Sequence, residues 1–452
     1  MGNRLLLVFH ADPDKRLSIG RLPPLGILYL SSYLEKHGIR ADIIDSSTRP
    51  FSLADVRPYD LIGFSINISN RECTLDAVSR IKNTFPEKRI IVGGPLSTCN
   101  PELFLRDPNL DAVFVGEGEE SLLEYLRLAE GNLLKGVYIK KGENFLFQGP
   151  REPIKNLDAL PFPALDKVNM RKYNNSPKKR LPISSMITSR GCPYQCIYCS
   201  HSMGRAWRPR SAEDVVAEMK WQVETFGVQE ICIFDDNFSL DKKRAAAICD
   251  LLVEEKLPLV LQFTNGLRVD CLDADLLAKL KKAKTWLVGL APESGNPEIL
   301  KKIKKGFGLS EVLAVRETCR KLGLATFGFF MIGFPFETKA DILATIDFAK
   351  RLDTEIVEFN KVIPYPETEL HEMMVRDGTL VAGADLQAKS YHDGPVATHK
   401  VGDLEGAEVK SLIRKSYREY YLRPRILGRL LKTFSLRDLW GLARYAVRTR
   451  NI

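Results

Sequence analysis

The 452-residue sequence contains no uninterrupted apolar run close to the roughly 20 residues that a membrane-spanning helix needs. No apolar stretch follows a basic region near Met1, because the chain runs straight into a predicted strand, which excludes a secretory leader. Position 6 is Leu6, so the N-myristoylation pattern is absent as well. We therefore expect a cytoplasmic protein that does not cross a membrane.

The sequence also lacks a Gly-x-Gly-x-x-Gly pattern after its first predicted strand, which argues against a nicotinamide or flavin dinucleotide. Disulfides are not indicated, because six of the nine cysteines are scattered singly through predicted strands and helices, as small buried residues are in a reducing compartment. These six are Cys73, Cys99, Cys232, Cys249, Cys271 and Cys319. The composition is 44% hydrophobic and 27% charged, which is typical of a soluble globular protein, and the length suggests two or three domains.

The other three cysteines, Cys192, Cys196 and Cys199, are separated by three and then by two residues. Thiolates hold cubane [4Fe–4S] clusters, and electron-carrying cubanes use four of them. Three cysteines therefore leave one iron open to a small molecule. A structural zinc site would need a fourth ligand, and the nearest candidate, His201, follows Cys199 too closely for the usual spacing. We favour the open iron–sulfur cluster and keep zinc as the alternative.

The N-terminal third alternates short apolar runs with helical stretches, which predicts a doubly wound parallel α/β sheet over residues 1–149. Strands are expected at 4–9, 41–45, 61–65, 90–92 and 112–115, a helix at 74–85, and a hairpin at 136–140 and 144–148. Glycines and hydroxyl residues follow the strands, where such sheets bind ligands. Glycines there allow a close approach to a large flat ligand, although each of these residues, taken alone, is also an ordinary turn residue.

After a proline-rich linker at 150–181, six strand–helix repeats predict an open, partial (β/α)6 barrel over 182–370. Strands are expected at 183–188, 230–234, 260–263, 286–290, 326–331 and 356–361, and helices at 212–225, 241–255, 274–283, 310–322 and 339–351. The cysteine motif follows the first of these strands. Chemistry in such barrels sits at the carboxyl ends of the strands, where this chain places its polar residues.

These motifs together resemble the cobalamin-dependent radical S-adenosylmethionine (radical SAM) enzymes over roughly residues 3–370. The Rossmann-like N-terminal domain resembles their cobalamin-binding domain through Pro24-Leu25-Gly26, the turn at 92–95 and the loop at 115–119. The resemblance implies cobalamin contacts from Ser65, Gly93, Gly94, Pro95, Ser97, Thr98, Gly116, Glu117, Gly118 and Glu119. The Asp-x-His-x-x-Gly motif is absent, so we expect no protein ligand on the lower face of cobalt. The alternative is a degenerate domain that no longer binds a corrin.

The barrel resembles the radical SAM core, and its most specific part is the cysteine motif. The resemblance implies that Tyr198 packs near the adenine and that Asp235 and Asp236 bind the methionine amino group. It also places Glu293 and Ser294 near the ribose and the carboxylate. A helix N-terminal cap is the alternative role for the two aspartates. The chain departs from the family at Glu367, where the family turn usually has glycine.

The resemblance implies that a low-potential electron donor, such as flavodoxin or ferredoxin, drives cleavage of S-adenosylmethionine to a 5′-deoxyadenosyl radical. The commonest outcome in the class is methylation of an unactivated carbon. The alternatives are an oxidation or ring closure, as in the anaerobic cyclase of chlorophyll synthesis, and a cobalamin-binding regulator with a vestigial radical domain. The three intact cysteines argue against the regulator.

Residues 371–452 are expected to form an irregular cap, from 371 to 400, and then a basic amphipathic helical extension. Between 421 and 452 eight basic residues face one acidic residue, Asp438, and apolar and aromatic residues interleave with them. Such a helix suits an anionic membrane surface, which would make the protein peripheral at the inner membrane face and its substrate lipophilic, of the polyprenoid, hopanoid or tetrapyrrole type. The alternative is a terminal helix packed on the barrel. Nucleic acid is not expected, because no base-reading motif accompanies the charge.

Overall fold

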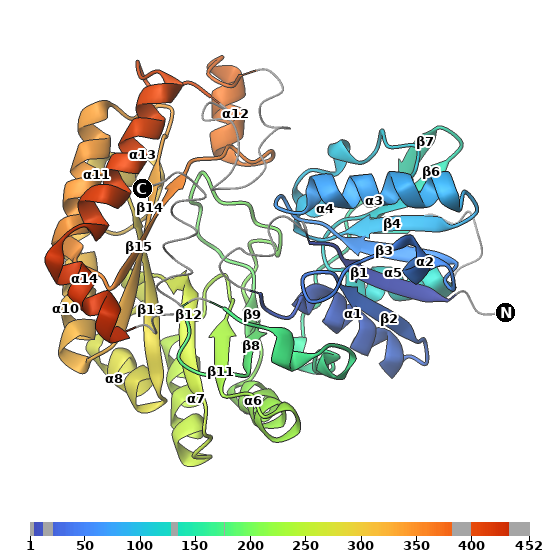
Figure 1. Ribbon diagram of the computed structural model, residues 1–452, viewed down its shortest axis with the longest axis horizontal. Coiled ribbons are helices and arrows are strands. Elements are labelled where there is room, and N and C mark those ends of the chain that lie inside the picture. The colour runs from blue at the N-terminus through green and yellow to red at the C-terminus, as the bar shows by residue number, and fades with distance from the viewer. Residues whose placement is uncertain (1–3, 12–20, 128–133, 176, 382–398, 434–452) are drawn as a thin grey trace. The chain divides into compact units, whose positions relative to one another are not determined.

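The computed structural model describes residues 4–11, 21–127, 134–175, 177–381 and 399–433. The chain forms two compact units, one of residues 1–173 with 201–209 and the other of residues 174–200 with 210–452 (Figure 1). Each unit is built on one large sheet, and each is described by itself below.

The first unit holds a seven-stranded sheet in the order β2-β1-β3-β4-β5-β6-β7. Its strands are β1 (Leu5–Phe9), β2 (Ala41–Asp45), β3 (Leu61–Ser65), β4 (Arg89–Gly93), β5 (Ala112–Phe114), β6 (Val137–Lys141) and β7 (Asn144–Phe147). Strands β1 to β5 are parallel, and the predicted hairpin β6–β7 joins the edge at β5 in antiparallel pairing. The strand order reverses between β1 and β3, and ligands of such sheets bind at that point, beyond the carboxyl ends of the strands.

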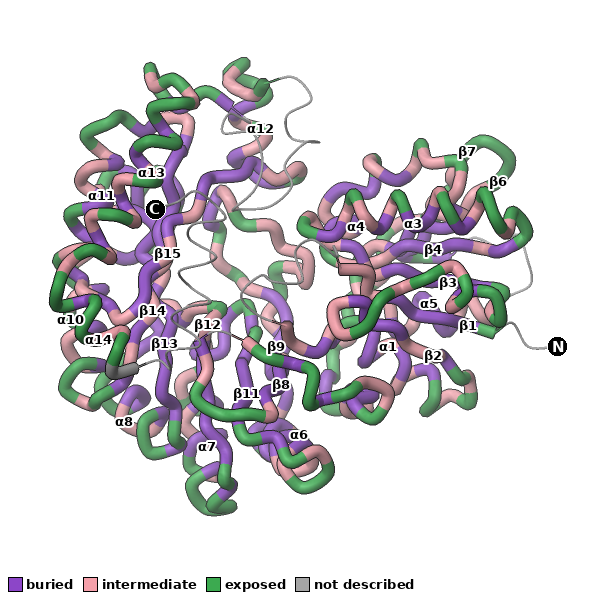
Figure 2. Tube along the Cα trace, viewed as in Figure 1, coloured by how far each residue is buried: buried purple, intermediate pink, exposed green. Residues whose placement is uncertain are grey.

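Helices cover both faces of this sheet, so its central strands are apolar on both sides (Figures 1 and 2). The helices are α1 (Leu25–Lys36), α2 (Leu53–Val56), α3 (Arg71–Thr84), α4 (Pro95–Cys99) and α5 (Gly118–Arg127). Side chains alternate between the faces along β1: Leu6 and Val8 lie in the core beneath α2, α3 and α4, whereas Leu5 and Leu7 lie in the core beneath α1 and α5. This double burial explains why the strands read as continuous apolar runs.

The second unit contains six parallel strands in the order β15-β14-β13-β12-β11-β8, which is the predicted open, partial barrel. The strands are β8 (Ile183–Met186), β11 (Glu230–Ile233), β12 (Val260–Leu267), β13 (Thr285–Glu293), β14 (Ala325–Ile332) and β15 (Ile356–Lys361). The helices between them are α6 (Ala212–Phe226), α7 (Lys242–Glu254), α8 (Ala274–Lys282), α9 (Pro297–Lys302), α10 (Leu309–Leu322) and α11 (Lys339–Leu352). Two short strands, β9 (Ser189–Arg190) and β10 (Arg208–Pro209), flank the cysteine segment in sequence.

The region after the barrel is more regular than predicted. Residues 369–376 form helix α12 (Glu369–Arg376), which Thr368 caps by accepting a hydrogen bond from the His371 backbone, so the expectation of an irregular segment was wrong there. Residues 382–398 lie outside the described part of the chain. Helix α13 (Gly406–Tyr421) then packs along α11 and the edge strand β15. The Tyr421 hydroxyl accepts from the Val357 amide at 2.9 Å and donates to the Val357 carbonyl at 2.6 Å, which covers the sheet edge.

Helix α14 (Pro424–Thr433) carries the described part of the basic extension. Arg425 and Arg429 form ion pairs with Asp353, the C-terminal cap of α11, and Leu430 packs against a core cluster that contains Trp286. Up to residue 433 the structure therefore has the packed helix that we considered as the alternative. Residues 434–452 lie outside the described part. Of the described helices, none has the length and apolar character needed to cross a membrane.

Candidate active site

The cysteine motif begins just after β9, at the carboxyl end of the barrel sheet. Cys196 is buried, and its thiol lies 3.7 Å from the Lys304 carbonyl. The Ile197 amide donates to the Ile303 carbonyl at 3.2 Å, so the segment after α9 supports the middle of the cysteine loop. The loop is thus held by a part of the chain about a hundred residues away, which the local sequence did not indicate.

Asp235, at the end of β11, anchors the start of the cysteine loop. Its buried carboxylate accepts hydrogen bonds from the Thr188 amide at 2.6 Å, the Thr188 hydroxyl at 2.5 Å and the Ser189 hydroxyl at 2.6 Å. Burial raises the pKa of Asp235, and the hydrogen bonds from Ser189 and Thr188 oppose that rise. The carboxylate therefore has a structural role, while its contact with the methionine amino group stays a prediction.

Asp236 differs from its neighbour because it is exposed. Its Oδ2 accepts from the Gly191 amide at 3.0 Å, one residue before the first cysteine. The helix-cap alternative was wrong for both aspartates, because the cap of α7 is Asp241, which accepts from the amides of Lys243 and Arg244. Of the two predicted ligands of the amino group, Asp236 has the more accessible carboxylate.

Tyr198, Glu293 and Lys305 form a partly buried polar cluster beside the last cysteine. The Tyr198 hydroxyl donates to Glu293 Oε1 at 2.9 Å, and Lys305 Nζ lies 2.9 Å from the same oxygen and 3.0 Å from the hydroxyl. Glu293 has φ of 69°, a left-handed conformation that costs a non-glycine residue energy and is typical of functional sites. The structure thus brings two predicted site residues together and adds Lys305, which the sequence reading missed.

Ser294 follows Glu293 but lies deeper. Its buried hydroxyl is 3.2 Å from the Thr345 hydroxyl on α11, and it accepts from the Asn296 amide at 3.2 Å. These contacts fix the turn after β13. The predicted contact of Ser294 with a bound carboxylate stays a prediction.

The carboxyl edge of the first unit carries the predicted corrin loops. Gly94 has φ of 110°, and a Cβ there would lie 2.9 Å from the Ile66 carbonyl oxygen and 3.2 Å from Ser65 Oγ, so only glycine fits. The Ser97 hydroxyl donates to the Phe114 carbonyl at 2.8 Å, and the Thr98 hydroxyl accepts from the Gly116 amide at 3.0 Å. The segments that follow β4 and β5 are therefore hydrogen-bonded to each other, and the Ser97 hydroxyl proton is donated to a group of the protein itself.

Glu117 in the second of these loops forms an ion pair with Arg208, and both side chains are buried, with 8% and 9% exposed. Glu117 Oε2 also accepts from the Ile154 amide at 2.7 Å, and Arg208 donates to the Ile154 carbonyl at 2.7 Å. This pair fastens the segment after the cysteine motif to the first unit. Gly93 ends β4, Pro95 begins α4, and Gly118 and Glu119 begin α5; their contacts with cobalamin, like that of Glu117, stay predictions.

The cysteine loop supplies three thiols, which are the ligand type that iron–sulfur clusters use. Among the described residues, no three His, Cys, Asp or Glu side chains gather around a single ion position. The cysteines nevertheless influence one another: burial raises the pKa of Cys192 most, and the charges of Asp236 and Cys196 add to the rise. Cys192, Cys196 and Cys199 would hold such a cluster through their thiolates.

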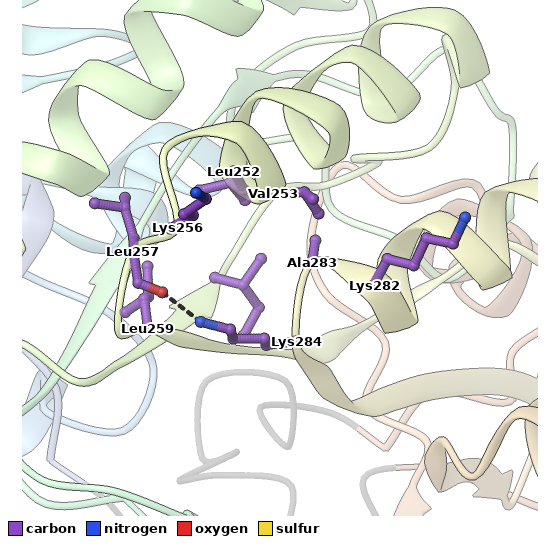
Figure 3. A pocket seen from close by; sticks show the side chains of 9 residues that line it. Leu252, Val253, Lys256, Leu257, Leu259, Lys282, Ala283 and Lys284 are labelled. Carbon is purple, nitrogen blue, oxygen red and sulfur yellow. Dashed lines mark hydrogen bonds between the residues drawn. The ribbon is translucent and has the colours of Figure 1, made fainter.

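A small cavity of about 130 Å³ lies at the other end of the barrel, where β12 and β13 begin and α7 and α8 end (Figure 3). Lys284 donates to the Leu257 carbonyl at 2.7 Å across it. Its lining is formed by leucines and lysines together with Val253 and Ala283. Because barrel chemistry belongs at the carboxyl ends of the strands, we do not assign this cavity to the active site.

Glu337, in the loop after β14, should make the stability of the protein depend on pH. Its carboxylate accepts from the amides of Gly333 and Phe334 at 2.7 and 2.9 Å, and burial raises its pKa from 4.5 to about 7. Between these values the folded protein keeps a proton that the unfolded chain releases, so this group lowers stability as pH rises from about 4.5 to about 7. Above about 7 the penalty is on the order of 3 kcal/mol.

The neutral variant Glu337→Gln should therefore gain stability relative to the parent as pH rises from 5 to 8. Urea unfolding of both proteins at pH 5 and pH 8 measures the difference in their free energies of unfolding. The buried His399, whose ring contacts the Gly333 carbonyl, is present in both proteins, so its own titration does not enter the difference. The exposed Glu372→Gln serves as the control. A constant difference between Glu337→Gln and the parent across this range would contradict the prediction.

Each of the two units contains a segment that matches a known family model. The family model of the radical SAM superfamily matches residues 186–349, and that of the B12 binding domain matches residues 18–126. An uncharacterized methyltransferase of Pyrococcus horikoshii is 33% identical over 90% of this chain and 89% of its own length. The cytidylyl-2-hydroxyethylphosphonate methyltransferase of Streptomyces wedmorensis is 27% identical over 88% of this chain and 86% of its own length.

A solved structure shares the fold. The radical S-adenosylmethionine methyltransferase TsrM from Kitasatospora setae, with cobalamin and a [4Fe-4S] cluster bound, gives a TM-score of 0.69 at 17% identity, covering 85% of this chain and 77% of that chain. The predicted α/β fold class, with a cobalamin-binding sheet followed by a radical SAM barrel, is confirmed.

Proposed function

The chain belongs to the cobalamin-dependent radical SAM enzymes, and from this premise we propose that it methylates an unactivated carbon of a lipophilic small molecule. When bound, the cofactors supply the chemistry: an electron from the [4Fe–4S] cluster to cleave S-adenosylmethionine, and a methyl group carried by cobalamin. The observation that carries methyl transfer is the 33% identical relative, which is named an uncharacterized methyltransferase and aligns over 90% of this chain and 89% of its own length.

In this proposal the residues of the barrel bind the cluster and S-adenosylmethionine and orient them. Cys192, Cys196 and Cys199 hold three irons, and Asp235 fixes the backbone at which their loop begins. The exposed carboxylate of Asp236 suits an ammonium group, because charge-assisted hydrogen bonds are the stronger ones. The Tyr198–Glu293–Lys305 cluster packs beside the last cysteine and limits the access of water from that side.

We propose that an acidic, low-potential donor such as flavodoxin or ferredoxin approaches near α9. Lys301, Lys302 and Lys304 are exposed there, and the carbonyl of Lys304 lies 3.7 Å from the Cys196 thiol. Lys304 is paired with Glu369, but both side chains are about half exposed and the pair is worth little in water. A basic surface beside the cluster would steer an acidic protein toward it.

The proposal of a lipophilic substrate is based on the basic helical extension. Within its described part Leu422, Leu427 and Leu431 are 59%, 45% and 62% exposed, an apolar surface that suits a membrane or an apolar ligand. Arg425 and Arg429 are engaged by Asp353, so a contact with anionic lipid stays a prediction that depends on residues beyond 433.

Mass spectrometry of anaerobic reactions with deuterated methyl S-adenosylmethionine tests the proposal. Cell extract is separated into a lipid fraction and a water-soluble fraction, and Cys196→Ala protein serves as the control. A lipid that gains the labelled methyl group only with the unaltered protein is expected. A labelled water-soluble product would retain methyl transfer and overturn the lipophilic substrate. Consumption of S-adenosylmethionine without labelled product would favour oxidation or ring closure, and no consumption would favour the regulator.

A further inference from the structure

Arg268 lies between β12 and the short turn at Val269–Cys271, beside the cysteine loop. Each nitrogen of its guanidinium group has a contact within the protein. Nε and Nη2 donate to the two carboxylate oxygens of Asp270 at 3.0 Å each, and Nη2 also donates to the Lys305 carbonyl at 2.7 Å. The remaining nitrogen, Nη1, lies 3.8 Å from the Cys196 thiol sulfur. The side chain is 10% exposed.

The face of the same guanidinium group is also occupied. Its central carbon lies 3.4 Å from the centre of the Tyr194 ring, which belongs to the cysteine motif, and 5.2 Å from that of Phe307. A planar cation can be stacked and hydrogen-bonded in its plane at the same time, which an ammonium group cannot. The arrangement holds the positive group against Cys196 in one orientation.

We propose that Arg268 is a positioning residue that directs positive charge at the Cys196 thiolate and thereby raises the reduction potential of the cluster. Reduction adds one negative charge to a cluster that three thiolates already make negative. A buried cation stabilises the reduced form more than the oxidised form, and hydrogen bonds to cluster sulfurs act in the same direction. Because Arg268 is largely shielded from water, solvent screens this effect less than it would at the surface.

Asp270 gives the inference its second test, because it lies on the edge of the guanidinium group that also meets Lys305, while Nη1 faces the sulfur. The Asp270 carboxylate therefore offsets part of the positive charge of Arg268 but does not come between Nη1 and the Cys196 sulfur. Removing Arg268 should lower the potential, and removing the charge of Asp270 should raise it. Lys305 is a less direct candidate, since its ammonium group is bound to Glu293 and Tyr198.

The test is an anaerobic redox titration of the reconstituted full-length protein, followed by the electron paramagnetic resonance signal of the reduced cluster. Arg268→Gln should shift the midpoint potential to a more negative value, and Arg268→Lys should restore part of the shift. Asp270→Asn should shift it to a more positive value. Arg320→Gln, on the surface of α10 with 59% of its side chain exposed, is the control and should leave the potential unchanged.

Unchanged midpoints in both Arg268→Gln and Asp270→Asn, or shifts of the same sign, would overturn the inference. If Arg268→Gln fails to take up iron, Arg268→Lys and Asp270→Asn still decide it, because each keeps a cation at this position. The inference rests on the proposed cluster but not on methyl transfer. Unaltered protein that forms no cubane would refute the cluster, whereas a normal cluster with an insensitive potential would refute only the role of Arg268.

Discussion

Replacement of Cys196 by alanine is expected to reduce 5′-deoxyadenosine formation to the level of a protein-free reaction. Cys196 is the middle of three thiols and is buried between the Lys304 carbonyl and the Arg268 guanidinium group. Without it the cluster would have only two protein thiolates, and no other thiol of the motif could replace it. Anaerobic reconstitution with iron and sulfide, followed by chromatography of the products after addition of dithionite and S-adenosylmethionine, measures the loss.

The matched control for this variant is Cys249→Ala. Cys249 is buried in α7, so the change also truncates a buried thiol in the same unit but leaves the cysteine loop untouched. This protein should retain its cluster and its cleavage activity, with only a modest loss of stability. Undiminished cleavage by Cys196→Ala would refute the assignment of this residue as a cluster ligand.

The second large effect is expected from Asp235→Ala. The substitution leaves the Thr188 amide and hydroxyl without the acceptor they have inside the protein, and leaves the Ser189 hydroxyl only the Asn237 carbonyl at 3.4 Å. Since an unsatisfied buried donor costs about 1–3 kcal/mol, we expect the free energy of unfolding to fall by about 3 kcal/mol or more. Because these residues immediately precede the cysteine loop, the iron bound after reconstitution should fall as well.

Asp236→Ala provides the matched comparison at the neighbouring position. The side chain is exposed and accepts from the Gly191 amide, and changes at exposed positions usually cost little stability, so the free energy of unfolding should fall less than in Asp235→Ala. Its proposed role predicts weaker binding of S-adenosylmethionine, measured by equilibrium dialysis with the reconstituted protein. The reverse pattern, with Asp235→Ala harmless to stability and Asp236→Ala destabilising, would show that the two carboxylates have been assigned the wrong roles.

The elements of both sheets could be predicted closely because their strands are buried on both faces. β2, β3 and β15 occupy the predicted residues 41–45, 61–65 and 356–361. The five predicted helices between the barrel strands deviate by at most one residue at each end, where caps such as Asp241 decide the boundary. Helix α12 was missed because it follows a turn with the unusual residue Glu367, and short helices have weak periodicity.

The sequence by itself determined the cysteine spacing, the parallel sheets and the loops at their carboxyl ends, because each is a local pattern of residue type and period. Only the tertiary structure decided which polar groups meet. Arg268 and Cys196 are 72 residues apart, and Arg208 and Glu117 are 91 residues apart, and no local pattern relates such pairs. Asp235 and Asp236 are equivalent in the sequence. They differ in the fold because, just beyond β11, the Asp235 side chain is buried against Thr188 and Ser189 whereas the Asp236 side chain is exposed.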